Sequence, residues 1–133
     1  MKQVSETTKP RPPVVLVADD EEHILHLVTD LMRMEGFQVL AASDGHEALE
    51  LARSYPGRID LVITDVDMPR LNGSDLCSYL LKERPVIKAL MMSGADIDRL
   101  RRNQNRVPVL PKPFDSQTLM ARVHALLSTE SPV

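Results

Sequence analysis

Five polar side chains stand at or just after the ends of four apolar runs, and their types are those that bind metal ions and phosphate groups. They are Asp19 and Asp20 after residues 14–18, Asp65 after 59–64, Ser93 after 86–92 and Lys112 after 107–110. Carboxylates held close together repel one another, so they either take up protons or hold a cation. An all-oxygen set suits Mg²⁺, and a carboxylate beside Mg²⁺ can attack a phosphoryl group while a lysine and a hydroxyl contact the phosphate oxygens. These residue types indicate phosphoryl-transfer chemistry if the fold brings them together.

The apolar runs are typical of strands buried on both faces of a parallel sheet, and they alternate with segments of helical periodicity. Strands are expected at 14–18, 37–42, 59–64, 86–92 and 107–110, and helices at about 20–35, from 44, at 74–84, at 95–105 and from 115. Five successive strand–helix units predict an α/β fold with a doubly wound parallel sheet. In such a sheet the ligand site lies beyond the carboxyl ends of the strands, where the polar residues stand.

Helix boundaries are marked by residues that favour caps. The candidates are Asp20 or a neighbour, Asp44 with Glu47 in a capping-box pattern, and Asp115 or Ser116. The buried stripe of the first helix is expected to contain Ile24, Leu27, Val28, Leu31 and Met34. Pro108 marks the fifth strand as an edge strand, because proline cannot donate to a central ladder.

Size and composition fit one domain without a disulfide or a membrane span. The chain has 133 residues, of which 43% are hydrophobic, and a net charge of -3. A primary nucleic-acid binder usually carries a strong basic excess, so direct nucleic-acid binding is not expected. Cys77 is the only cysteine, and no apolar run approaches the ~18 residues of a membrane helix. We expect a cytoplasmic protein with a flexible leader at 1–12, one domain at 13–128 and a tail at 129–133.

Four motifs together resemble the signature of response-regulator receiver domains of two-component signalling. They are Ala18-Asp19-Asp20-Glu21, Asp65-Val66-Asp67-Met68-Pro69-Arg70-Leu71-Asn72-Gly73, Met92-Ser93-Gly94 and Pro111-Lys112-Pro113-Phe114. Each motif alone is a weak signal, but the four occur in the family's order and each lies at an expected strand end. The resemblance covers about residues 13–128. It implies a flavodoxin-like (βα)5 domain with strand order 2-1-3-4-5.

The resemblance also implies how the site works. Asp65 would accept a phosphoryl group from the phosphohistidine of a sensor histidine kinase or phosphotransfer protein. The phosphoprotein would later lose the group by Mg²⁺-dependent self-dephosphorylation. The Mg²⁺ ligands would be Asp19, Asp20, Asp65 and the backbone carbonyl of Asp67.

Two further residues would sense the phosphoryl group. Ser93 matches the family's switch hydroxyl, and Lys112 matches its phosphate-binding lysine, whose bond to Pro113 is expected to be cis. A downstream effector protein would recognise the switched state on the face of the fourth helix, fifth strand and fifth helix. Such a domain is not an enzyme, because it changes only its own phosphorylation state.

The sequence departs from the family pattern at two points. Val109 stands three positions before Lys112, where well-studied receivers usually have an aromatic residue that rotates with the switch hydroxyl. Only 19 positions separate Ser93 from Lys112, so the fourth helix is expected to be short or irregular. The sequence thus predicts an intact site and an atypical read-out.

Plainer interpretations exist for the same residues. Asp19 and Asp20 could simply cap a helix, and Lys112 could lie on the surface. His23 and His26, three residues apart, are expected to lie on a solvated helix face. The same holds for a basic run that comprises Arg99, Arg101, Arg102 and Arg106.

Two other functions compete with the receiver hypothesis. Asp65-Val66-Asp67 resembles the nucleophile and acid pair of haloacid dehalogenase-type phosphatases, although Met68-Pro69 follows it here. A degenerate receiver that only binds proteins is favoured by Val109 and opposed by the complete acidic set.

Overall fold

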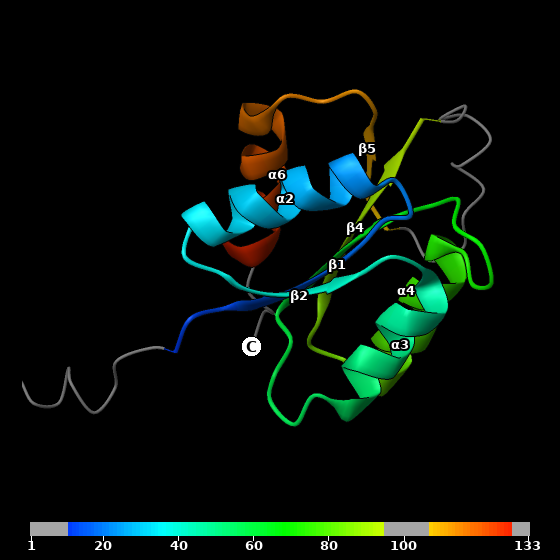
Figure 1. Cartoon of the computed structure of the whole chain (residues 1–133). Helices are drawn as coiled ribbons and strands as arrows, with labels where there is room; N and C mark the ends of the chain where they lie inside the picture. The colour runs from blue at the N-terminus through cyan, green and yellow to red at the C-terminus, as the bar shows by residue number, and fades with distance from the viewer. Residues whose placement is uncertain (1–10, 95–106, 129–133) are drawn as a thin grey trace, which may run out of the picture.

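The computed structural model describes residues 11–94 and 107–128, where strands and helices alternate (Figure 1). The strands are β1 (Val14–Ala18), β2 (Gln38–Ala42), β3 (Leu61–Asp65), β4 (Lys88–Ser93) and β5 (Val109–Pro111). The helices are α2 (Glu22–Met34), α3 (Gly45–Ser54), α4 (Gly73–Glu83) and α6 (Ser116–Ser128). The expected helix at 95–105, the basic run, the tail and the leader as far as residue 10 lie outside the described residues.

The strands form one parallel sheet in the order β2-β1-β3-β4-β5. This order confirms the doubly wound, flavodoxin-like α/β fold. β5 lies at the edge of the sheet, as the proline just before it predicted. Pro108 has no N–H to donate, but its carbonyl accepts a hydrogen bond from Met91 N–H at 2.9 Å. The expected cis bond between Lys112 and Pro113 is present.

Helices cover both faces of the sheet, with α3 and α4 on one side and α2 and α6 on the other (Figure 1). Side chains of β1 alternate between the two cores: Val14, Leu16 and Ala18 pack with α3 and α4, whereas Val15 and Val17 pack with α2 and α6. All five are buried. Burial on both faces explains why this strand is a continuous apolar run.

The buried face of α2 differs from the expected stripe. The buried positions are Leu25, Val28, Thr29 and Met32. Leu27 is 46% exposed and Met34 is 80% exposed, so the prediction that these two residues are buried was wrong. The apolar residues of α2 occupy more than one face of the helix, and hydrophobicity alone did not show which face meets the sheet.

Side-chain caps begin two of the helices as predicted. Asp44 accepts a hydrogen bond from Glu47 N–H at 2.7 Å, and Asp115 accepts one from Thr118 N–H at 2.7 Å. The Glu47 carboxylate does not close the box on Asp44 but accepts from the backbone N–H and the hydroxyl of Ser43. At α2 the cap position is Glu21, which makes no side-chain cap, so the cap expected there is absent.

Candidate functional site

The carboxyl ends of four strands meet at one edge of the sheet and carry the predicted polar residues. Asp19 directly follows β1, Asp65 and Ser93 end β3 and β4, and Lys112 directly follows β5. The Lys112 backbone N–H donates to the Ser93 carbonyl at 2.7 Å, which extends the strand pairing into the site. Strand pairing therefore sets the spacing between these residues.

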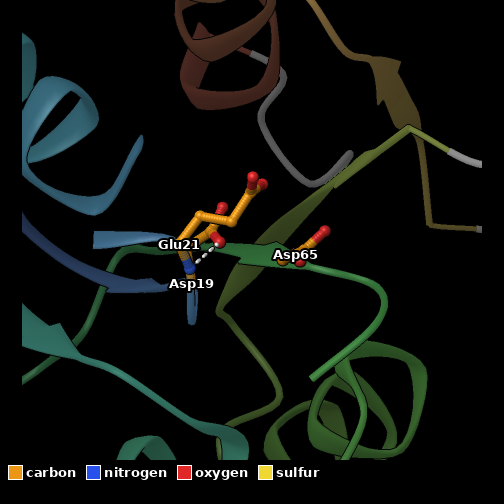
Figure 2. A group of neighbouring side chains, drawn as sticks. All are labelled: Asp19, Glu21 and Asp65. Carbon is orange, nitrogen blue, oxygen red and sulfur yellow. Dashed lines mark hydrogen bonds between the residues drawn. The ribbon is translucent and has the colours of Figure 1, made fainter. Parts of the chain in front are cut away.

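Three carboxylates converge at this edge, those of Asp19, Glu21 and Asp65 (Figure 2). Each offers an oxygen that lies within 4.8 Å of the others. Asp19 is completely buried, and Asp65 is 6% exposed. Asp19 Oδ1 accepts a hydrogen bond from the Glu21 backbone N–H at 2.9 Å, which fixes the turn between β1 and α2.

Asp20 and Asp67 belong to the rim of the same site. A pocket of about 470 Å³ is lined by Asp20, Glu21, Asp65, Asp67, Gly94 and Lys112. Asp20 and Asp67 are both exposed, in contrast to Asp65. The structure thus brings together four of the predicted acidic residues. Ser93 is buried, with 1% exposure, next in sequence to Gly94, which lines the pocket.

Lys112 supplies the positive charge of the site. Its Nζ lies 2.8 Å from Glu21 Oε1, 3.1 Å from Asp19 Oδ2 and 3.4 Å from Asp65 Oδ1. The lysine side chain is only 13% exposed. One ammonium group therefore faces three carboxylates, and the cluster keeps an excess of negative charge.

Burial and charge shift the pKa values of the site. The pKa of Asp65 rises to about 6, mainly because burial disfavours the ionised carboxyl and because Asp19 is close, while Lys112 opposes the rise. Burial also raises the pKa of Asp19, against the hydrogen bonds from Glu21 and Lys112. Burial alone would lower the pKa of Lys112, but its hydrogen bonds to Glu21 and Asp19 outweigh this and raise it.

The loop between β3 and α4, which carries Asp67, is anchored against its surroundings. A Cβ atom on Gly73 would lie 2.0 Å from the Asp65 carbonyl oxygen, so only glycine allows this close approach. Arg70 adopts a left-handed φ of 71°, and its guanidinium lies 3.1 Å from Asp44 Oδ2. The ion pair ties this loop to the beginning of α3.

Glu21 is a member of the site that was not among the residues predicted to bind the metal ion or the phosphoryl group. Its carboxylate completes the acidic cluster and makes the shortest contact with Lys112. The available signal was a third consecutive acidic residue after the strand, Asp19-Asp20-Glu21. That signal is weak, because acidic residues are favoured in any first helical turn.

The donor set fits a hard divalent cation such as Mg²⁺. Carboxylate oxygens from separate strand ends approach one another, and the adjoining pocket leaves room for water ligands. Asp67 also lines this pocket, so its backbone carbonyl is a candidate ligand. His23 and His26 are exposed on α2, and within residues 11–94 and 107–128 they belong to no group of metal-ligating side chains.

Comparisons with known proteins agree with this geometry. The sequence model of the response regulator receiver domain matches residues 15–124. The transcriptional regulatory protein CpxR of Escherichia coli K12 is 39% identical over 116 residues, which cover 85% of this chain and 48% of the regulator. The sensor kinase CckA of Brucella abortus is 33% identical over 119 residues, 87% of this chain and 13% of the kinase. A receiver domain from Clostridium thermocellum superposes with a TM-score of 0.77 at 30% identity, covering 86% of this chain and 94% of that one.

A doubly wound parallel sheet with a carboxylate cluster and a lysine at its carboxyl edge defines a CheY-like domain of the flavodoxin-like class. The chain belongs to the response regulator receiver domain family, whose members are phosphoacceptors in two-component signalling. It spans about half the length of the curated regulators that it matches. Among the described helices, none has the length and apolar character needed to cross a membrane.

Proposed function

We propose that Asp65 accepts a phosphoryl group from the phosphohistidine of a sensor histidine kinase or a phosphotransfer protein. The observation that carries this proposal is the position of the Lys112 ammonium, 3.4 Å from Asp65 Oδ1 within a cluster of carboxylates. The Asp65 carboxylate borders an open pocket, whereas the Asp19 carboxylate is fully buried. Asp65 is therefore the strand-end carboxylate that a phosphoryl group can reach.

In the proposed transfer, an oxygen of the Asp65 carboxylate forms a bond to phosphorus as the phosphorus–nitrogen bond of the donor histidine breaks. The electron pair of the broken bond stays on the imidazole nitrogen, which then takes up a proton from solvent. The product is an acyl phosphate on Asp65. Lys112 can follow the new negative charge because its ammonium is already in contact with Asp65.

The acidic residues would hold Mg²⁺, with Asp19, Asp20 and Asp65 as carboxylate ligands and Asp67 contributing its backbone carbonyl. When bound, Mg²⁺ neutralises charge on the phosphoryl oxygens. In the hydrolysis step a water oxygen attacks phosphorus, the bond to the Asp65 oxygen breaks, and inorganic phosphate leaves. Self-dephosphorylation restores the free carboxylate, so the chain acts as a switch rather than as an enzyme on other substrates.

Ser93 and β5 would carry the signal away from Asp65. The Ser93 hydroxyl would donate a hydrogen bond to a phosphoryl oxygen, which favours the conformation in which the serine reaches the site. Val109 in β5 is half-buried and packs against the core on the side of α3 and α4. A valine cannot make the ring rotation of an aromatic residue, so we expect the effector protein to recognise a shift of the backbone around β5 and α6. We place this exchange in the cytoplasm, where its kinase partners act.

The experiment is phosphorylation by acetyl phosphate in the presence of Mg²⁺, followed by intact-mass spectrometry. The wild-type chain should gain the mass of one phosphoryl group, and the adduct should decay after the donor is removed. Asp65→Asn should gain nothing. Asp67→Asn is the matched control, because it removes a nearby carboxylate but keeps the backbone carbonyl, and it should still be modified. Continuous turnover of many phosphate esters without an adduct would favour a phosphatase instead.

A further inference from the structure

Glu21 lies at a position where its side chain has no structural task on its own helix. It is the N-cap residue of α2 but makes no side-chain cap. Its backbone is fixed on both sides, because its N–H donates to Asp19 Oδ1 at 2.9 Å and its carbonyl accepts from Leu25 N–H at 2.9 Å. The carboxylate instead reaches across the site to Lys112, 91 residues away in the chain.

The contact with Glu21 is the shortest of the three that Lys112 makes. The Lys112 Nζ atom lies 2.8 Å from Glu21, compared with 3.4 Å from Asp65. The carboxylate of Glu21 has 51% exposure and that of Asp65 has 9%. The lysine is thus held toward the solvent side of the cluster, next to α2, and only loosely toward the carboxylate at the end of β3.

We propose that Glu21 is a positioning residue that holds Lys112 in the unphosphorylated state and competes with the phosphoryl group for it. This inference rests on the proposed function of Asp65 and adds a regulator of that site. A phosphoryl group on Asp65 brings new negative oxygens close to Lys112, and these oxygens compete with the Glu21 carboxylate for the ammonium. The strength of the Glu21–Lys112 pair therefore sets part of the free-energy difference between the unphosphorylated and phosphorylated states.

The competition has a definite direction. Removing the charge of Glu21 frees Lys112 and removes a negative group that repels the phosphoryl oxygens. Both effects stabilise the phosphorylated state. Since Glu21 is half-exposed, the expected gain is that of a single solvent-screened ion pair, about two- to fivefold in affinity for a phosphoryl mimic.

The test is a titration with beryllofluoride, a phosphoryl mimic, at saturating Mg²⁺, followed by amide NMR of ¹⁵N-labelled protein. Glu21→Gln should bind beryllofluoride about two- to fivefold more tightly than the wild type. Glu22→Gln is the matched control, because Glu22 is the next residue, is exposed in the first turn of α2 and carries the same charge. It should bind as the wild type does. In a Lys112→Ala background the effect of Glu21→Gln should fall to that of the control.

Several results would overturn the inference. If Glu21→Gln and Glu22→Gln bind the mimic equally well, the effect of Glu21 is only its general charge. If Glu21→Gln binds it more weakly, the carboxylate serves the metal ion and not Lys112. An effect that persists in Lys112→Ala would also contradict a role through the lysine. Failure of the wild-type chain itself to bind beryllofluoride would refute the proposed function, and this inference with it.

Discussion

Asp19 and Asp65 hold their carboxylates side by side at the ends of neighbouring parallel strands, with 0% and 6% exposure. Two buried groups of like charge disfavour ionisation in the folded chain, and one lysine offsets this only in part. The site is thus destabilising until a cation offsets its negative charge. Such a cost is common at functional sites and leads to measurable predictions.

The first prediction concerns Asp65 and pH. The pKa of Asp65 is about 6 in the folded chain, whereas an unfolded aspartate titrates near its ordinary value of about 3.9. The folded chain therefore binds the proton more tightly, and the wild type loses stability as pH rises through this interval. Asp65→Asn should be more stable than wild type by roughly 1–3 kcal/mol at about pH 7.5 without Mg²⁺.

The gap between Asp65→Asn and wild type should shrink as the pH falls below about 6 and close at about pH 3, below the pKa of this residue in both the folded and the unfolded chain. Urea unfolding followed by circular dichroism at several pH values measures it. Asp67→Asn, which removes an exposed carboxylate, is the control and should show no such gap. A stability difference that stays constant with pH would contradict the assigned burial of the Asp65 charge.

The second prediction concerns Lys112 and Mg²⁺. Lys112→Ala leaves the carboxylates of Asp19 and Asp65 without their cation, so the metal-free variant should lose roughly 1–3 kcal/mol of stability. The same change removes a positive charge from the metal site, and Mg²⁺ affinity should rise about five- to thirtyfold. Calorimetric titration with Mg²⁺ and thermal unfolding with and without the ion measure both effects.

Lys82→Ala, at an exposed position of α4, is the control for the loss of one lysine. It should alter neither Mg²⁺ affinity nor the stabilisation by Mg²⁺. If Lys112→Ala bound Mg²⁺ no better than Lys82→Ala, the carboxylates that hold the ion could not be those that contact Lys112.

The third prediction concerns the close approach at Gly73. In Gly73→Ala the new methyl group would lie 2.0 Å from the Asp65 carbonyl oxygen, a backbone atom that cannot rotate away. The loop that carries Asp67 would have to shift, so we expect a loss of at least about 2 kcal/mol and weaker Mg²⁺ binding. Gly94→Ala meets no atom within 4 Å and should keep its stability. Equal melting temperatures for the two variants would show that the loop is not held as described.

The fourth prediction concerns Arg84, which supports the fold away from the site. Its guanidinium donates to three carbonyl oxygens at and beyond the end of α3, those of Ala52, Tyr55 and Gly57, each at 2.8 Å. Arg84→Ala should cost about 1.5–3 kcal/mol, because carbonyls that accept from a charged donor lose their partner. Arg84→Lys should recover only part of this, since an ammonium cannot reproduce the planar fork. If urea unfolding showed that Arg84→Ala and Arg84→Lys are both as stable as the wild type, this role of Arg84 would be contradicted.

The placement of the site was predictable because it follows from strand ends. A continuous apolar run such as 14–18 forms a strand buried on both faces, and parallel strands align their carboxyl ends at one edge. The positions of Asp19, Asp65 and Lys112 follow from that rule without any knowledge of side-chain contacts. The caps at Asp44 and Asp115 were also predictable, because their partners lie three residues away.

Features that depend on distant contacts were not predictable. Glu21 joins the site only because Lys112, which follows β5, reaches the start of α2. Leu27 is 46% exposed although its residue type suits a core, because the orientation of α2 is set by packing against β1 and β2 rather than by its own sequence. The ion pair of Arg70 with Asp44 likewise joins two loops whose proximity exists only in the folded chain.

The most direct test of the central claim is to locate the acyl phosphate on the chain. The protein is phosphorylated with acetyl phosphate and Mg²⁺ and treated with borohydride, which reduces an aspartyl phosphate to homoserine, and peptides are then sequenced by tandem mass spectrometry. The geometry predicts homoserine at position 65 alone, and none when Mg²⁺ is chelated. Homoserine at Asp19, Asp20 or Asp67, or no reduction at all in a fully folded sample, would contradict the assignment of Asp65 as the phosphoacceptor.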